Sequence, residues 1–231
     1  KDGKITTLFG DDRWLHQPYR IDSLARAYAN VTEALGFKPL HHESKITGLA
    51  AYGKPELKET FQSQFFFDEN GLINSRFTDG TVMRERFISW CEGCSRENVS
   101  ASVQEFVEDM MIESVGRLME THKVQKLGLA GGLFANVKLN QRLTQKCGVD
   151  EVFVMPPMGD EGLVIGGVMQ YLLERDGLKT WLGNRYRLND VYWGRGFGTD
   201  TGQRITGFSP SIKKLDGAIV ETAARLLKSG K

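Results

Sequence analysis

The chain has 231 residues, of which 40% are hydrophobic and 26% charged, a composition that fits one large or two small globular domains and excludes fibrous and disordered classes. Its 30 Lys and Arg balance 29 Asp and Glu, so no overall basic field would attract nucleic acid or an acidic membrane surface. No apolar run approaches the roughly 18 to 20 residues that span a bilayer, and three cysteines do not suggest a secreted disulfide framework. We therefore expect a cytoplasmic protein with no nucleic-acid or membrane partner.

The first half of the chain predicts mainly helices and one hairpin. Asp22 is placed to cap a helix that Gly36 ends, because the apolar residues between them recur at three- and four-residue spacing. A short segment over 46–51 stops before Gly53 and Pro55. Two strand-like runs within 64–76 flank Asn70-Gly71, which predicts a hairpin.

The second half predicts an α/β layered sheet. A core helix is expected over 102–121, with Ser102 and Glu105 as a capping box. A strand over 127–130, a helix over 136–146, a strand over 152–155 and a helix over 162–173 then alternate through short loops. Residues 183–210 resemble a linker, after which Asp216 is placed to cap a last amphipathic helix.

Two loops at the ends of neighbouring strands are candidates for chemistry. Gly131-Gly132, followed by a helix from Asn136, would let backbone amides approach a phosphate, although such turns are also plain packing devices. Asp160 follows the next strand and could bind a hard cation, or it could only cap the helix that follows. Because both loops belong to one sheet edge, a nucleotide with a divalent metal becomes plausible.

A third candidate is Glu43-Ser-Lys45, which could bind ribose hydroxyls and a phosphate or could be a solvated charged turn. Two other patterns carry little weight. The Cys91 and Cys94 pair follows a predicted helix instead of opening one, and adjacent His41 and His42 rarely reach one metal ion.

Taken together, these stretches resemble the O-carbamoyltransferases of the NodU/CmcH type, which act on nodulation factors, cephem antibiotics and aminoglycosides. The resemblance is carried by Glu43-x-Lys45-x-x-Gly48-Leu-Ala-Ala-Tyr-Gly53, by Gly131-Gly132-Leu-Phe-Ala-Asn136, and by Pro156-Pro-Met-Gly-Asp160-x-Gly162. It covers nearly the whole chain and is least distinctive over 186–231.

The resemblance implies a fold and a reaction. Residues 1–185 would be the later portion of an actin-like, sugar-kinase-like (ribonuclease H-like) domain related to tRNA threonylcarbamoyl transferases, and 186–231 a linker and the beginning of a YrdC-like domain. The YrdC-like part would make carbamoyl-adenylate from carbamoyl phosphate and ATP, and the actin-like part would move the carbamoyl group to a hydroxyl of a sugar or secondary-metabolite acceptor.

The resemblance also assigns residues to roles. Gly131, Gly132 and Asn136 fall on the adenylate-binding loop, Asp160 on a metal-ligand position, and Glu43 and Lys45 on the segment lining the nucleotide cleft. The metal would be Fe, Mn or Mg. No side chain stands out as the general base.

The chain begins without Met inside a turn pattern and ends just after a helical run, so we expect it to be an excised piece. The family's His-x-x-x-His metal pair and its Arg-rich stretch are not found in it, and we expect the piece alone to be inactive. A threonylcarbamoyl transferase acting on tRNA and a non-catalytic actin-like binding module are the alternatives. An exposed sheet edge could also pair with a second copy as a homodimer.

Overall fold

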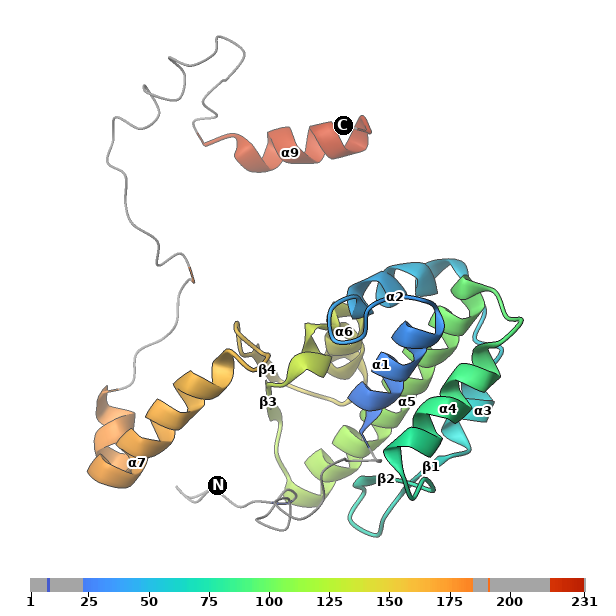
Figure 1. Ribbon diagram of the computed structural model, residues 1–231. Helices are drawn as coiled ribbons and strands as arrows, with labels where there is room; N and C mark the ends of the chain where they lie inside the picture. Colours follow the sequence, from blue (N-terminus) through green and yellow to red (C-terminus); the bar gives the residue numbers. More distant parts are fainter. Residues whose placement is uncertain (1–7, 9–22, 185–190, 192–216, 231) are drawn as a thin grey trace. The chain divides into compact units, whose positions relative to one another are not determined.

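The computed structural model describes residues 8, 23–184, 191 and 217–230, and the chain divides into two units, Lys1–Arg185 and Tyr186–Lys231 (Figure 1). The described part of the first unit mixes strands with a larger share of helix, which makes it an α/β unit that is mostly helical. Its elements in chain order are α1 (Leu24–Ala34), α2 (Glu43–Leu49), η2 (Ala50–Tyr52), α3 (Lys58–Gln62), β1 (Phe65–Phe67), β2 (Ile73–Ser75), α4 (Gly80–Cys91), α5 (Arg96–His122), β3 (Lys126–Leu129), η3 (Gly132–Ala135), α6 (Val137–Lys146), β4 (Glu151–Val154) and α7 (Gly162–Asn184).

The long helix α5 is the centre of the first unit. It contacts α1, α2, α3, α6 and η2, and Figure 1 shows the four α-helices of this set around it. Its buried residues lie on all sides over 99–104, as expected for a helix enclosed by others. The core is partly aromatic, because Phe106 of α5 lies 6.2 Å from Phe61 of α3, which stacks in turn on Phe87 of α4 at 4.9 Å.

The predicted start of this helix was wrong. The helix begins at Arg96 after Ser95, whose hydroxyl accepts a hydrogen bond from the amide of Asn98 at 3.2 Å. Ser102 lies buried inside the helix, where its hydroxyl donates to the carbonyl of Asn98 and accepts from the amide of Leu57. Ser102 and Glu105 have the spacing of a capping box, but Ser102 does not cap the helix. Its buried side chain bonds to a neighbouring segment at Leu57 instead of to a helix end.

The predicted start of α1 was wrong by one residue, and its predicted end is confirmed. Ser23, and not the predicted Asp22, caps the helix, and its side chain accepts from the amide of Arg26. Gly36 ends the helix as predicted with a φ of 75°, and the next amide, that of Phe37, donates back to the carbonyl of Thr32.

Both predicted strand pairs form. Strands β1 and β2 make the antiparallel hairpin, with Phe66 opposite Asn74 and Gly71 at a φ of 81° in the turn. Strands β3 and β4 are parallel, with Leu127 opposite Val152, and α6 connects them. The alternation of strand and helix predicted for this stretch is therefore confirmed, and the carboxyl ends of β3 and β4 lie at one sheet edge.

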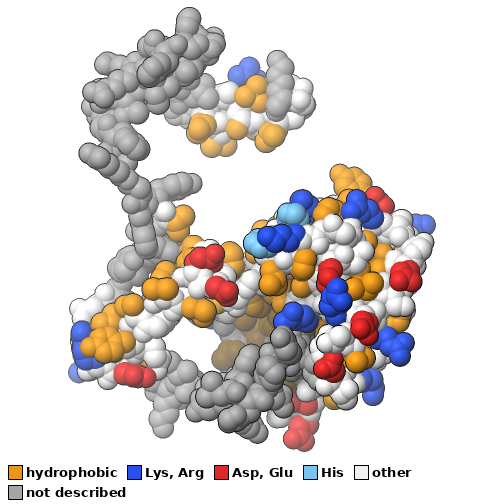
Figure 2. Space-filling view, in the orientation of Figure 1, with side chains coloured by type: hydrophobic (Ala, Val, Ile, Leu, Met, Phe, Trp, Pro, Cys, Tyr) orange, Lys and Arg blue, Asp and Glu red, His pale blue; other side chains and the backbone are white. Residues whose placement is uncertain are grey.

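Helix α7 is longer than predicted, since it reaches Asn184 across a break at Gly177, where φ is 77°. Many of its hydrophobic side chains are exposed, and hydrophobic side chains gather along the helix in Figure 2. The exposed ones include Leu163, Val164, Val168 and Tyr171. Among the described residues, no helix is both long and apolar enough to cross a membrane.

The second unit contributes one described helix, α9 (Ile219–Lys228). The helix forms as predicted, but its cap residue is Ala218 and not Asp216, which lies outside the described residues. The turn pattern at the start of the chain and most of the predicted linker over 183–210 also lie outside them.

Candidate functional site

The two candidate loops meet where β3 and β4 end. The amide of Gly131 donates to the carbonyl of Met158 at 2.6 Å, and the amide of Met155 donates to the carbonyl of Leu129 at 2.9 Å. Backbone hydrogen bonds thus join the loop after β3 to the loop after β4. The expectation that the two loops share one edge of the sheet is confirmed.

A pocket of about 570 Å³ opens at this edge, and we call it the shared pocket. Helices α1 and α2 form one wall, and the loops after β3 and β4 form the other. Its volume lies within the range of about 300 to 1,000 Å³ typical of small-molecule sites. The lining residues used below are Tyr28, His41, Glu43, Thr47, Gly132, Asn136, Asp160 and Glu161.

Four of the six predicted ligand-binding residues therefore line one pocket, although they come from segments far apart in the sequence. Glu43 faces it from α2, Gly132 and Asn136 from the first loop, and Asp160 from the second. The Glu43 carboxylate also accepts a hydrogen bond from the amide of Leu40 at 2.6 Å, which holds the turn before α2.

Lys45 and Gly131 are not among the lining residues. Lys45 is exposed on another side of α2, and its ammonium group lies 5.2 Å from the centre of the Phe37 ring. Gly131 shapes the loop through its backbone conformation, because residues with a side chain strongly disfavour its φ of 112°. A Cβ atom at Gly132 would meet no atom within 4 Å, so the surface beside this residue is open.

Asp160 is exposed at the mouth of the pocket. Within the described residues its carboxylate has no partner, so it does not cap α7 through its side chain. Glu43 and Glu161 add two further carboxylates, and no described lining residue is Lys or Arg. A phosphate ligand would therefore need a cation to accompany it, and oxygen ligands of this kind suit a hard divalent cation.

The carboxylates do not make a complete metal centre. Over the described ranges, no group of three or more His, Cys, Asp or Glu side chains is arranged to hold an ion. The exposed carboxylate of Asp160 has the chemistry of one such ligand.

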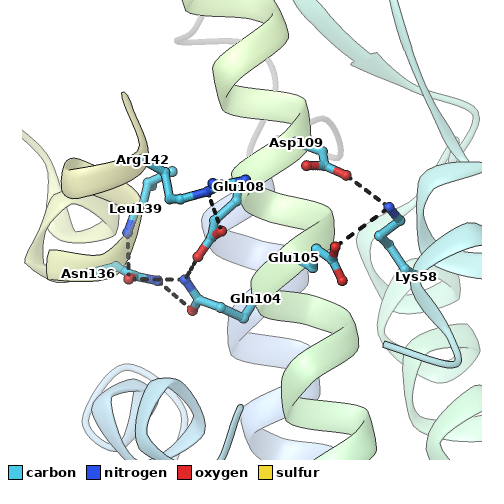
Figure 3. Close-up of polar contacts among 8 residues, drawn as sticks. All are labelled: Lys58, Gln104, Glu105, Glu108, Asp109, Asn136, Leu139 and Arg142. Atoms are coloured by element: carbon cyan, nitrogen blue, oxygen red, sulfur yellow. Dashed lines mark hydrogen bonds and ion pairs between the residues drawn. The ribbon is translucent and has the colours of Figure 1, made fainter. Parts of the chain in front are cut away.

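The side chain of Asn136 is committed to the fold. Its Oδ1 accepts from the amide of Leu139 at the start of α6 and from Nε2 of Gln104, while its Nδ2 donates to Oε1 of Gln104 at 2.8 Å (Figure 3). One Nδ2 hydrogen remains for a ligand. Asn136 therefore shapes the pocket mainly by fixing the end of the Gly131–Ala135 turn.

Comparison with known proteins identifies the family of this chain. A family model described as the carbamoyltransferase N-terminus matches residues 5–169. The chain belongs to the carbamoyltransferase N-terminus family. This match includes both walls of the shared pocket and confirms the resemblance drawn from the three sequence stretches.

Relatives agree with this membership. The chain is 28% identical over 190 residues to nodulation protein NolNO of Sinorhizobium fredii, which covers 78% of the chain and 26% of the relative. It is 30% identical over 177 residues to an uncharacterized protein of Methanocaldococcus jannaschii, covering 74% of the chain and 29% of the relative. A tRNA N6-adenosine threonylcarbamoyltransferase of Lacticaseibacillus casei is 26% identical over 159 residues, 64% of the chain and 45% of that protein. The chain thus spans between about a quarter and a half of these relatives.

Three buried polar residues in or behind the shared pocket were not predicted as site residues from the sequence. Tyr28 was only one of the apolar positions in the helix predicted between Asp22 and Gly36, and Gln104 and Glu108 were not distinguished within the core helix predicted over 102–121. All three are buried, and burial raises the pKa of Tyr28 so that its phenol stays neutral. The sequence did contain a signal for a buried polar pair. Gln104 and Glu108 are four residues apart and so lie on one side of the predicted helix, where other residues are apolar.

Neither the Cys91 and Cys94 pair nor the His41 and His42 pair acts as a pair in the structure. Cys91 ends α4 in the core, where burial raises the pKa of its thiol to about 12, and Cys94 donates to the carbonyl of Trp90. His41 lines the shared pocket, whereas Nδ1 of His42 accepts from the amide of Lys38. The adjacent histidines are thus engaged in different places.

Proposed function

We propose that this chain is part of an O-carbamoyltransferase and that the shared pocket holds the nucleotide end of a carbamoyl-adenylate. The observation that carries the proposal is the meeting of the Gly131-Gly132 turn and Asp160 in one pocket of a chain from the carbamoyltransferase family. The full enzyme would form the adenylate from carbamoyl phosphate and ATP. It would then transfer the carbamoyl group to a hydroxyl of a sugar or secondary metabolite.

The pocket supplies binding and orientation for this transfer. At Gly132 the absence of a side chain lets a phosphate approach the backbone, and the Glu43 oxygen that is not held by Leu40 can accept from ribose hydroxyls. In the transfer step the acceptor hydroxyl gives up its proton to water, its oxygen forms a bond to the carbamoyl carbon, the bond from that carbon to the phosphate oxygen breaks, and AMP leaves with the bonding electrons. Holding AMP in advance lowers the entropic cost of reaching this geometry.

Asp160 is proposed to supply one ligand to a divalent cation, with the remaining ligands coming from residues outside the described part. Such a cation, when bound, would polarise the carbamoyl carbonyl and neutralise charge on the leaving phosphate. The carboxylate itself is a poor general base in that role.

The remaining parts of the proposal concern the whole enzyme. Residues 1–185 would be the later portion of its actin-like domain, and 186–231 the linker and the start of a YrdC-like domain. The relationship to a threonylcarbamoyltransferase supports the actin-like assignment, because that relative is matched over 64% of this chain.

The test is carbamoyl transfer by the full-length enzyme with Asp160→Asn. We expect at least about a tenfold loss of transfer from carbamoyl phosphate, since replacing even an outer partner of a metal site commonly has this effect. Asp150→Asn is the matched control. Asp150 is exposed like Asp160, but it precedes β4, whereas Asp160 follows that strand. Equal rates for the two variants would contradict the assignment of Asp160.

The tRNA-modifying relative favours one second candidate, a threonylcarbamoyl transferase acting on tRNA. The near-neutral charge of the chain argues against a polyanionic partner. Two incubations distinguish the candidates. Radioactive carbamoyl phosphate with ATP should label hydroxylated small molecules if the first candidate is right, whereas radioactive threonine with bicarbonate and ATP should label unmodified tRNA if the second is right, because a threonylcarbamoyl group contains threonine.

A further inference from the structure

A buried glutamine lies behind the shared pocket. Gln104 projects from α5, is 6% exposed and does not line the pocket. Glu108, one turn further along the same helix, is 5% exposed. Figure 3 shows both side chains directed toward the segment of Asn136 and Arg142, whereas Glu105 and Asp109 point toward Lys58 on another side of α5.

Gln104 bonds to the wall made by α1 and α2. The hydroxyl of Tyr28 donates to Oε1 of Gln104 at 2.9 Å and shares a second hydrogen bond of 2.9 Å with the hydroxyl of Thr47. Tyr28 and Thr47 both line the pocket. One end of the glutamine amide is therefore connected to the first wall through a chain of two hydrogen bonds.

Gln104 also bonds to the opposite wall. Its amide pairs with that of Asn136 in both directions, at 2.8 Å from Asn136 Nδ2 to Oε1 and at 3.2 Å from Nε2 to Asn136 Oδ1. Asn136 lines the pocket and begins α6. A single buried side chain thus contacts residues of both walls.

Glu108 fixes which way round this amide lies. Its Oε1 accepts from Nε2 of Gln104 at 2.8 Å, and its Oε2 pairs with Nε of Arg142 at 3.2 Å. Because a carboxylate only accepts, Nε2 must face Glu108 and Oε1 must face Tyr28 and the Nδ2 of Asn136. Reversing the amide would break these bonds in a buried place, where unpaired polar groups are costly.

We propose that Gln104 is a positioning residue for the shared pocket: it holds Tyr28 and Asn136, and with them the two walls, at the separation that the nucleotide requires. The proposal rests on the proposed function, because it takes the nucleotide to be the ligand. It goes beyond it by assigning a role to a residue that never contacts the ligand.

The test compares the full-length enzyme with two variants of α5. Gln104→Leu keeps the size of the side chain and removes every bond to both walls. Ser114→Ala is the matched control, since Ser114 is equally buried on α5 and donates to the carbonyl of Gly71, in the hairpin turn and away from the pocket. Calorimetric titration with AMP measures affinity, and scanning calorimetry measures the melting temperature.

We expect both variants to melt at a lower temperature, but only Gln104→Leu to bind AMP more weakly, by about fivefold or more, in the range of typical coupling between sites. Unchanged AMP affinity in a less stable Gln104→Leu enzyme would show a merely structural role and overturn the proposal. Absence of AMP binding by the unaltered enzyme would instead overturn the proposed function, and this proposal with it.

Gln104→Glu provides a second reading, which also serves if Gln104→Leu does not fold. A carboxylate can accept from Tyr28 and Asn136 but cannot donate to Glu108 unless it is protonated. The groups that face it are Tyr28, Glu108 and, beyond them, Glu43 and Arg142. The AMP affinity of this variant, divided by that of the unaltered enzyme at the same pH, should rise as the pH falls, because the ratio removes the titration of the AMP phosphate and of the groups that both enzymes share. A ratio that does not change with pH would contradict the positioning role.

Discussion

Gly131 and Gly132 are adjacent, yet the structure needs them for different reasons. Gly131 has a φ of 112°, which residues with a Cβ rarely adopt. Gly132 has ordinary backbone angles and open space where a Cβ would lie. The first glycine is therefore required by the chain itself, whereas the second would be required only by a ligand.

Alanine at each position should separate these requirements. Gly131→Ala should lower the free energy of unfolding by about 1 to 3 kcal/mol, the usual cost of a strained backbone conformation. Gly132→Ala should change it by less than about 0.5 kcal/mol, as for surface substitutions without contacts. Urea unfolding followed by circular dichroism measures both, and an equal loss in the two variants would contradict this distinction.

Single residues also show where sequence reasoning reached its limit. The placement of Gly132, Asp160 and Glu43 around one pocket could be expected from the sequence, because each lies beside a recognisable element end. Lys45 was placed in the same cleft as Glu43, although residues two apart on a helix project about 200° apart. The pairing of Gln104 with Asn136 joins residues 32 positions apart, and no local pattern indicates such a contact.

At the level of elements, the start of α5 depends on two serines with different tasks. Ser95 caps the helix, while Ser102, seven residues later, ties it to the chain before α3 through the amide of Leu57. Sequence pattern alone favoured the second serine as the cap, because it is followed by Glu105 at the right spacing. Only the packing of 54–57 against α5 reveals its actual partner.

Replacing each serine by alanine tests this boundary. Ser95→Ala should cost about 1 kcal/mol of unfolding free energy, as lost N-caps do. Ser102→Ala should cost about 1 to 3 kcal/mol, because the partly buried amide of Leu57 loses its acceptor. If thermal unfolding showed Ser95→Ala to be neutral, the helix start described here would be wrong.

The contact between α1 and α4 carries a pH dependence. A hydrogen bond from Arg84 lowers the pKa of Glu33 below its ordinary value of 4.5. A lowered pKa means that the pair stabilises the fold above pH 4.5 and that this contribution is lost as the pH falls through the native pKa of Glu33.

Glu33→Gln should therefore be slightly less stable than the unaltered chain at pH 7, and the difference should close as the pH approaches 3. Glu69→Gln, at an exposed position in the hairpin turn, should show no such difference. Melting temperatures recorded across this range measure the effect, and a gap that widens in acid would contradict it.

Across the whole molecule, the parallel order of β3 and β4 could be predicted because short loops alternate with strand and helix patterns. That order alone brings the glycine turn and Asp160 to one edge. The full length of α7 and the exposure of its apolar side chains could not be predicted, because the sequence does not reveal which residues pack against this helix. Family membership adds the expected chemistry, while the chain spans only part of the relatives' length.

The central claim is that the shared pocket binds the adenylate. A crystal structure of the full-length enzyme with AMP tests it most directly. The account predicts the AMP phosphate within hydrogen-bonding distance of the backbone amide of Gly132, with Asp160 facing the same ligand. AMP bound elsewhere while the space between Gly132 and Asp160 stays filled by solvent would contradict it.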